Sequence, residues 1–204
     1  MKYLKMLGLA VVAAAALMAF VGAGTASATT LAIGGVAQNK AVTLEATLLP
    51  GTSALLKDEF GTTTDTCLSS TVEGTTENRV SPETTRFTGA VVGGKINTLD
   101  FTQCTHTTTV LAPGSLHVTW ISGTDNGTVT SIGAEVTVQS TFFGASAVCK
   151  TGEGTDIGTL TGKTLTTEHA IMDINAKINC GILGSSSWTG TYKVTSPTGL
   201  SVKS

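Results

Sequence analysis

Hydrophobic and polar side chains alternate along much of the chain after residue 28. The alternation is clear over residues 42–48, 116–120, 135–139, 172–180 and 188–194, where one face of each run is apolar and the other is polar. A period of two residues is typical of strands that bury one face, and Val, Ile, Thr and aromatic residues favour such strands. We therefore expect short, half-buried strands over most of this region.

Turn-forming residues separate these runs. Asp125-Asn126-Gly127 is the strongest such signal, because Asn-Gly tolerates positive φ at both central positions of a two-residue turn. It predicts a tight hairpin between strands at residues 116–121 and 128–132. Residues 53–59 have room for one helical turn. Many short strands joined by turns predict an all-β fold, either an antiparallel β-sandwich or a barrel-like sheet.

Residues 1–28 have the three parts of a secretory signal peptide. Lys2 and Lys5 precede an apolar run over residues 6–21, and small residues follow, with Ala26 and Ala28 at the −3 and −1 positions of a cleavage site. The pattern predicts an N-terminal signal helix that is removed before Thr29. The alternative is an uncleaved anchor, but the apolar run is shorter than a typical membrane span of about 20 residues. We expect no stable membrane insertion after cleavage, and a secreted domain over residues 29–204.

Charge excludes one class of partner. Without Lys2 and Lys5 the chain carries 10 basic and 14 acidic side chains, a formal net charge of −4, compared with −2 for the full sequence. A mildly acidic chain without a basic cluster lacks the electrostatic attraction that nucleic-acid binding needs. We therefore expect no nucleic-acid partner.

All four cysteines follow the expected cleavage site. An even number of cysteines in an exported protein predicts disulfides, because the extracellular space is oxidising. Four cysteines allow three pairings. We favour Cys67 with Cys104 and Cys149 with Cys180 on the hypothesis of two degenerate repeats, at about residues 29–138 and 139–204, each with one such pair followed by a tryptophan strand. The alternative is that the two halves resemble each other only because both are rich in Thr and Gly.

Several segments between residues 60 and 200 carry a resemblance to known proteins. They are Gly-Lys-Ile-Asn-Thr-Leu-Asp-Phe-Thr-Gln-Cys ending at Cys104, Pro-Gly-Ser-Leu-His-Val from Pro113, and Trp-Thr-Gly-Thr-Tyr-Lys-Val-Thr-Ser-Pro from Trp188. Together they resemble exported, Thr- and Gly-rich β proteins of soil actinobacteria with two disulfides and no assigned function. The resemblance implies a bacterial, secreted β protein and supplies no active site.

The chain offers few residues for catalysis, metal binding or cofactor binding. Its three histidines, His106, His117 and His169, have no spacing typical of a metal site, and Cys104 with His106 can chelate zinc only if Cys104 is reduced. The acidic residues that a hydrolase would use are best sought among Asp156, Glu168 and Asp173. Solvated strand edges and turns explain these acids equally well. We predict no catalytic, metal or cofactor site and no cofactor.

Three functions remain open at this point. The leading hypothesis is a secreted or cell-surface protein without enzyme activity, structural or adhesive, whose hydroxyl-rich strands contact a cell-wall polymer or other copies of the chain. The second is a soluble extracellular module that binds a sugar or a lipid near Trp120 or Trp188. A secreted hydrolase is the third, and it rests on export alone.

Overall fold

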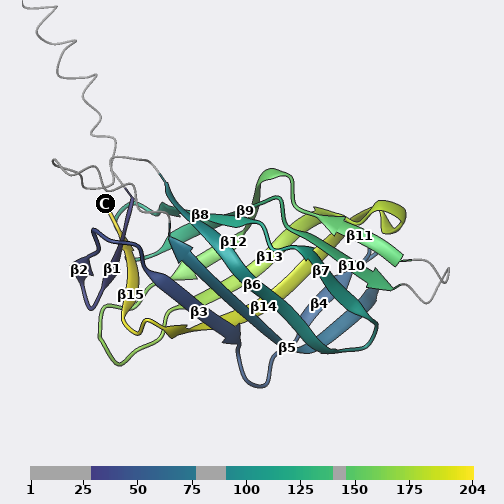
Figure 1. Ribbon diagram of the computed structural model, residues 1–204, viewed down its shortest axis with the longest axis horizontal. Coiled ribbons are helices and arrows are strands. Elements are labelled where there is room, and N and C mark those ends of the chain that lie inside the picture. Colours follow the sequence, from purple (N-terminus) through teal and green to yellow (C-terminus); the bar gives the residue numbers. More distant parts are fainter. Residues whose placement is uncertain (1–28, 77–90, 140–145) are drawn as a thin grey trace, which may run out of the picture.

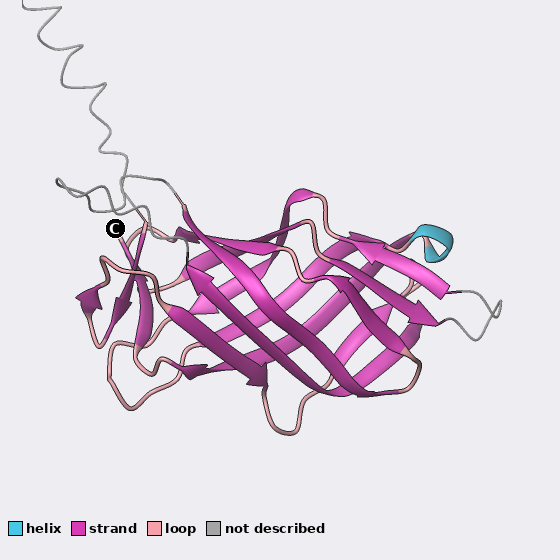
Figure 2. Ribbon diagram, viewed as in Figure 1, coloured by secondary structure: helices cyan, strands magenta, loops and turns pink. Residues whose placement is uncertain are grey.

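The computed structural model describes residues 29–76, 91–139 and 146–204. The expected signal helix and cleavage residues Ala26 and Ala28 lie outside the described residues, whereas Thr29 lies within them. The described part of the chain is almost entirely strands, in agreement with the predicted all-β fold (Figure 2).

The strands are named in chain order, and a single-turn 3-10 helix, η1, precedes β14. Their bounds are β1 Thr30–Ile33, β2 Val36–Ala37, β3 Thr43–Leu48, β4 Ala54–Lys57, β5 Thr63–Thr76, β6 Val92–Cys104, β7 Thr108–Ala112, β8 Ser115–Trp120, β9 Gly127–Ile132, β10 Glu135–Gln139, β11 Ser146–Lys150, β12 Glu153–Thr161, β13 Ile171–Asn179, η1 Gly181–Leu183, β14 Ser185–Ser196 and β15 Leu200–Lys203.

Eight of these strands close into an antiparallel barrel (Figure 1). The order around the barrel is β3, β5, β6, β8, β9, β12, β13 and β14, and β14 pairs with β3 to close the ring. Strands from both predicted repeats therefore belong to one continuous sheet. Closure removes the exposed edges that an open antiparallel sheet would present along these ladders.

One position in the barrel is filled by two strands placed end to end. Strands β3 and β4 each lie between β5 and β14, and a loop that contains Pro50 and Gly51 (φ 82°) separates them. The helical turn expected over residues 53–59 is wrong, because Ala54 and Leu56 point into the core while Leu55 and Lys57 alternate with them. Pairing on both edges fixes this segment as a strand.

The hairpin between β8 and β9 is present, but its turn differs from the prediction. Trp120 pairs with Gly127, so the connection is six residues long, and its positive φ falls on Gly123 (φ 76°). Gly127 lies inside the strand, where an added Cβ would come within 2.7 Å of Val118 Cγ1. The glycine is therefore required for close packing, and Asn126 uses its side-chain oxygen to accept a hydrogen bond from the backbone of Gly162 (3.0 Å).

A three-stranded sheet of β2, β1 and β15 lies at one end of the barrel, at the left of Figure 1. Lys203 pairs with Asp125 of the β8–β9 loop (3.2 Å), and the backbone N–H of Val202 donates to the carbonyl of Asp125 (2.9 Å). The backbone N–H of Trp120 donates to Thr29 Oγ1 (3.0 Å). These contacts fix the small sheet, which we call the cap, against the barrel.

The barrel interior is filled by the apolar faces that the alternation predicts. In β13, Met172, Ile174 and Ala176 are buried and the intervening polar residues are exposed, which confirms the period-two pattern. Tyr192 of β14 is fully buried, and its hydroxyl donates a hydrogen bond to the hydroxyl of buried Ser70 (3.0 Å).

The described residues contain no helix that is long and apolar enough to cross a membrane.

Candidate functional site

Both disulfides lie at the end of the barrel opposite the cap. Cys67 of β5 faces Cys104, the last residue of β6, in the ladder and is bonded to it. Cys149 of β11 is bonded to Cys180, which follows β13. These are the two pairings that the sequence favours. The second bond reinforces a weak junction, because Lys150 with Asn179 is the single ladder pair between β11 and β13 among the described residues.

The barrel wall is incomplete beside the disulfides. Among the described residues, β6 pairs with β8 over Val92–Lys95 alone, and β7 pairs with β10 alone. After the turn at residues 105–107, no ladder joins β6 to β7 within the described residues. The two strands stay close, because the backbone N–H of Ile96 donates to the carbonyl of Gly114, just after β7 (3.2 Å). The sheet of β7, β10 and β11 therefore lies over this end of the barrel and is joined to β6 by the turn rather than by a ladder.

A partly open cavity of about 70 Å³ lies under this part of the wall, and we call it the disulfide-end cavity. Its surface is almost entirely apolar side chains, including Leu56, Leu99, Phe101, Val136, Ile178 and Trp188. A second apolar cavity of about 80 Å³ lies toward the cap. Along β14, Trp188 lines the first cavity and Val194 lines the second, so Tyr192 stands between them.

Aromatic rings form one side of the disulfide-end cavity. The Trp188 ring packs edge-on against Phe101, with 5.6 Å between ring centroids, and against Tyr192, with 6.5 Å between centroids. Trp188 therefore lies beside a cavity, as the hypothesis of a binding module near Trp120 or Trp188 requires. Trp120 does not line either cavity, and its indole N–H donates to the carbonyl of Thr124 in the β8–β9 loop (2.7 Å).

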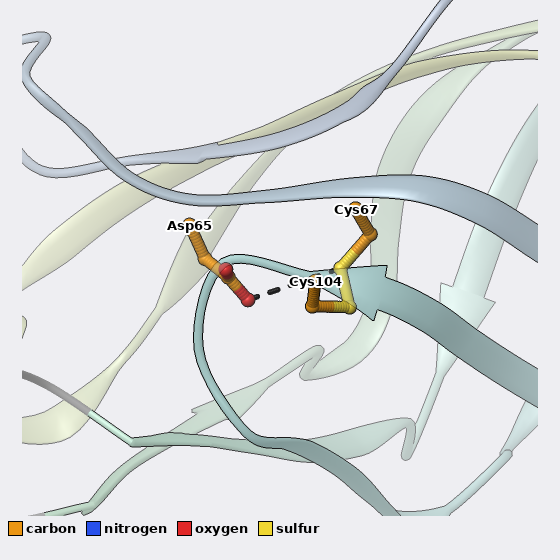
Figure 3. A group of neighbouring side chains, drawn as sticks. All are labelled: Asp65, Cys67 and Cys104. Carbon is orange, nitrogen blue, oxygen red and sulfur yellow. Dashed lines mark hydrogen bonds between the residues drawn. A yellow bond between two sulfur atoms is a disulfide. The ribbon is translucent and has the colours of Figure 1, made fainter.

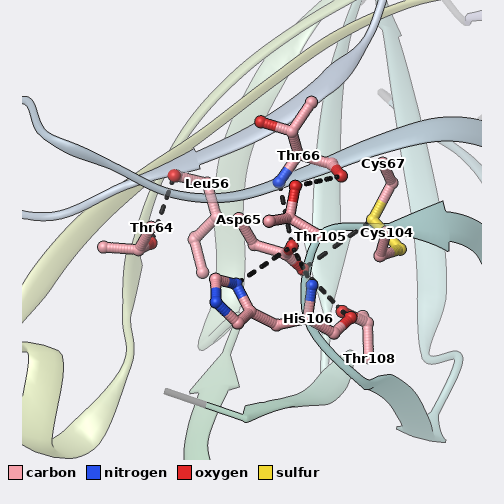
Figure 4. Close-up of polar contacts among 9 residues, drawn as sticks. All are labelled: Leu56, Thr64, Asp65, Thr66, Cys67, Cys104, Thr105, His106 and Thr108. Carbon is pink, nitrogen blue, oxygen red and sulfur yellow. Dashed lines mark hydrogen bonds and ion pairs between the residues drawn. A yellow bond between two sulfur atoms is a disulfide. The ribbon is translucent and has the colours of Figure 1, made fainter. Parts of the chain in front are cut away.

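Asp65 supplies the one acidic group of the cavity lining within the described residues. Its side chain is 3% exposed and accepts hydrogen bonds from the backbone N–H of Thr66 (2.9 Å) and His106 (3.0 Å) and from the hydroxyl of Thr108 (2.6 Å). Figure 4 shows how these groups bring the turn after β6 against the start of β5. His106 Nδ1 lies 3.6 Å from Asp65 Oδ1 and makes no hydrogen bond.

Asp65, Cys67 and Cys104 bring ligand-type atoms within 4.8 Å of one another (Figure 3). Both sulfurs belong to the disulfide, so neither is a thiolate, and the 3.8 Å approach of Cys67 Sγ to Asp65 is a packing contact without a proton to share. In this oxidised form Cys104 and His106 do not offer the zinc chelate that their spacing allows.

The structure does not bring the other candidate residues to this cavity. His117 lies within β8, and His169 Nδ1 contacts the carbonyl of Val194 (2.7 Å). Asp156 accepts a hydrogen bond from the backbone of Gly158, Asp173 accepts one from Thr191, and Glu168 lies in the loop before β13.

Sequence reasoning missed Asp65. Its position two residues before Cys67 in a strand places both on one face, and this signal could have identified it.

A row of polar side chains crosses the outside of the barrel. Ladder pairing places one residue from each of β8, β9, β12, β13 and β14 in register, namely Thr119, Thr128, Thr159, Asp173 and Thr191. Their neighbours Val118, Val129, Leu160, Met172 and Tyr192 point inward. We call these five residues the threonine row, and adjacent members are spaced by about 4.8 Å, the distance between strands.

Comparison of the chain with protein-family models, with curated proteins and with solved structures found no match. The resemblance to exported actinobacterial proteins therefore stays a prediction.

Proposed function

We propose that the chain is a secreted, non-enzymatic protein that binds a small apolar ligand in the disulfide-end cavity. The observation that carries this proposal is the partly open, almost wholly apolar cavity at the disulfide end of the barrel. Apolar pockets with a few polar groups at the mouth of a barrel are typical binding sites for small molecules. Two disulfides support an oxidising compartment, and the predicted signal peptide supports export.

The size of the cavity limits the ligand. An engineered apolar cavity of about 150 Å³ in another protein holds one benzene molecule. The disulfide-end cavity, at about 70 Å³, is half as large and takes a group of a few carbon atoms. A larger ligand would leave its remainder outside the open side of the cavity. This geometry favours a compact apolar group over a long lipid chain or a whole sugar ring.

Trp188 fluorescence tests the proposal. We expect short branched alcohols to change Trp188 emission saturably in a Trp120→Phe variant, because Trp188 lines the cavity. A Trp188→Phe variant, in which Trp120 is the reporter, should show no change. Monosaccharides should leave both variants unchanged. An Ala54→Leu variant, which fills the cavity from β4, should lose the response while it keeps its circular dichroism spectrum. An absence of saturable change in the Trp120→Phe variant contradicts the proposal.

The threonine row favours adhesion to a cell-wall polymer as a second candidate function. Regularly spaced outward hydroxyls can bind successive hydroxyl groups along an extended polysaccharide. We expect Thr128→Val with Thr159→Val to reduce retention on purified cell wall by about tenfold, because each lost hydrogen bond contributes about 0.5–1.5 kcal/mol. Thr43→Val, an exposed change on β3 outside the row, serves as control. Equal retention of the two variants, or no retention of the unaltered protein, argues against this role.

A further inference from the structure

In the described part of the chain, the carboxylate of Asp65 is buried beside the disulfide-end cavity, and its one ion-pair partner is His106, which is a cation only when it is protonated. All of its hydrogen-bond donors are neutral groups, namely two backbone N–H groups and the hydroxyl of Thr108. Burial of a carboxylate is costly, and buried charges in proteins are normally paired with an opposite charge or bound to a metal. The electrostatic partner of Asp65 is therefore incomplete in the described part of the chain.

The nearby basic groups do not fill this role. Lys150 also lines the cavity, but its ammonium group is bound to Glu135 (2.8 Å) and its side chain is half exposed. His106 lies 3.6 Å from Asp65 Oδ1 and carries a charge only when it is protonated. The carboxylate can thus accept a positive charge that a ligand brings.

The aromatic rings of the same cavity suit a cation as well as an apolar group. Trp188 and Phe101 line the cavity together with Asp65. A cation over the face of an aromatic ring is stabilised by about 0.5–2 kcal/mol, and Trp is the most favourable ring. Quaternary ammonium groups, which are compact, apolar at their surface and positively charged, fit both features of the cavity.

We propose that the ligand of the disulfide-end cavity carries an ammonium group, primary or methylated, that pairs with Asp65 and packs on Trp188. This inference rests on the proposed function and specifies the chemistry of its ligand. The ammonium head occupies the cavity, and the rest of the ligand extends from its open side.

Asp65 also has a structural role, and the two roles are separable. It holds the turn after β6 through His106 and Thr108. The amide oxygen of asparagine can accept hydrogen bonds from the same neutral donors, but it lacks the negative charge. Asp65→Asn is therefore expected to keep the fold and lose the attraction for cations.

The experiment compares choline with 3,3-dimethylbutan-1-ol, its neutral isostere, by calorimetry and Trp188 fluorescence. We expect choline to bind the unaltered protein about tenfold more tightly than the alcohol, given the combined gain from the carboxylate and the aromatic ring. Asp65→Asn should make the two affinities equal. Asp100→Asn, which removes an exposed carboxylate from β6, serves as the charge-matched control and should keep the preference.

The outcomes separate this inference from the proposed function. Equal binding of both probes by the unaltered protein, or tighter binding of the alcohol, overturns the ammonium inference and leaves an apolar site. A choline preference that survives in folded Asp65→Asn overturns the role of Asp65. Failure of both probes to bind overturns the proposed function as well. The comparison of probes on the unaltered protein decides the inference even if Asp65→Asn does not fold.

Discussion

Replacing Cys149 and Cys180 together by alanine is expected to lower the free energy of unfolding by roughly 3.5–4 kcal/mol. The bond closes a loop of 31 residues, and the loss of this constraint on the unfolded chain has an effect of that size. Replacing Cys67 and Cys104 together by alanine should lower the free energy of unfolding by a similar amount, because their bond closes a loop of 37 residues. Urea unfolding followed by Trp fluorescence measures both changes.

Removal of all four cysteines should leave the chain largely unfolded, because a combined loss of about 7–8 kcal/mol reaches the total stability of many single domains. The two double variants control for each other, since both remove a cross-link at the same end of the barrel. Treatment of the unaltered protein with a reductant should reproduce the effect without any substitution. A loss below about 1 kcal/mol in either double variant would contradict this expectation.

Tyr192 is expected to ionise with a midpoint near pH 12 in the folded protein. Burial raises its pKa to about 12 from the ordinary value of 10, and the hydrogen bond with Ser70 opposes this rise. The sequence has two tyrosines, Tyr3 and Tyr192, so after removal of residues 1–28 the tyrosinate absorbance reports Tyr192 alone. The same titration in urea should show a midpoint near 10.

The raised pKa makes stability depend on pH. Because the folded state holds the Tyr192 proton more tightly than the unfolded state does, the contribution is complete below pH 10 and is lost as the pH rises from 10 toward 12. A rise of about two pKa units corresponds to roughly 3 kcal/mol. Tyr192→Phe should remove this dependence and cost about 1 kcal/mol at neutral pH through the lost hydrogen bond. The two proteins differ in the Tyr192 hydroxyl alone, so the difference between their alkaline unfolding curves isolates this group. Parallel curves would contradict its burial.

Local patterns in the sequence predict the strands well because buried and exposed side chains alternate along each half-buried strand. The alternation from Met172 to Ile178 follows directly from one face that packs inside the barrel and one that meets water. The favoured cysteine pairing, which rested on the repeat hypothesis, also agrees with the structure. Turn chemistry is a weaker guide. Asn126-Gly127 carries the signature of a tight hairpin, yet Gly127 is needed for close packing and the turn forms elsewhere.

Closure of the barrel and the candidate site could not be predicted in this way. The ring closes where Ser196 pairs with Glu45, and no local pattern records a partner so distant in the chain. In the sequence, Asp65 looks like any other polar residue of a Thr-rich strand. Only the folded structure shows that it lines a cavity with Trp188 and holds the turn at His106. The cavity is lined by side chains of β4, β5, β6, β10, β13 and β14, and the sequence of any one of these strands does not show that they meet.

The pairing of β1 with β15 has a consequence for the order in which the protein matures. Thr30–Ile33 can join the sheet only after Leu200–Lys203 has been synthesised, because the two segments form one ladder. In the secretion proposed above, with the amino end crossing the membrane first, this ladder can form outside the cell only after Leu200–Lys203 has crossed.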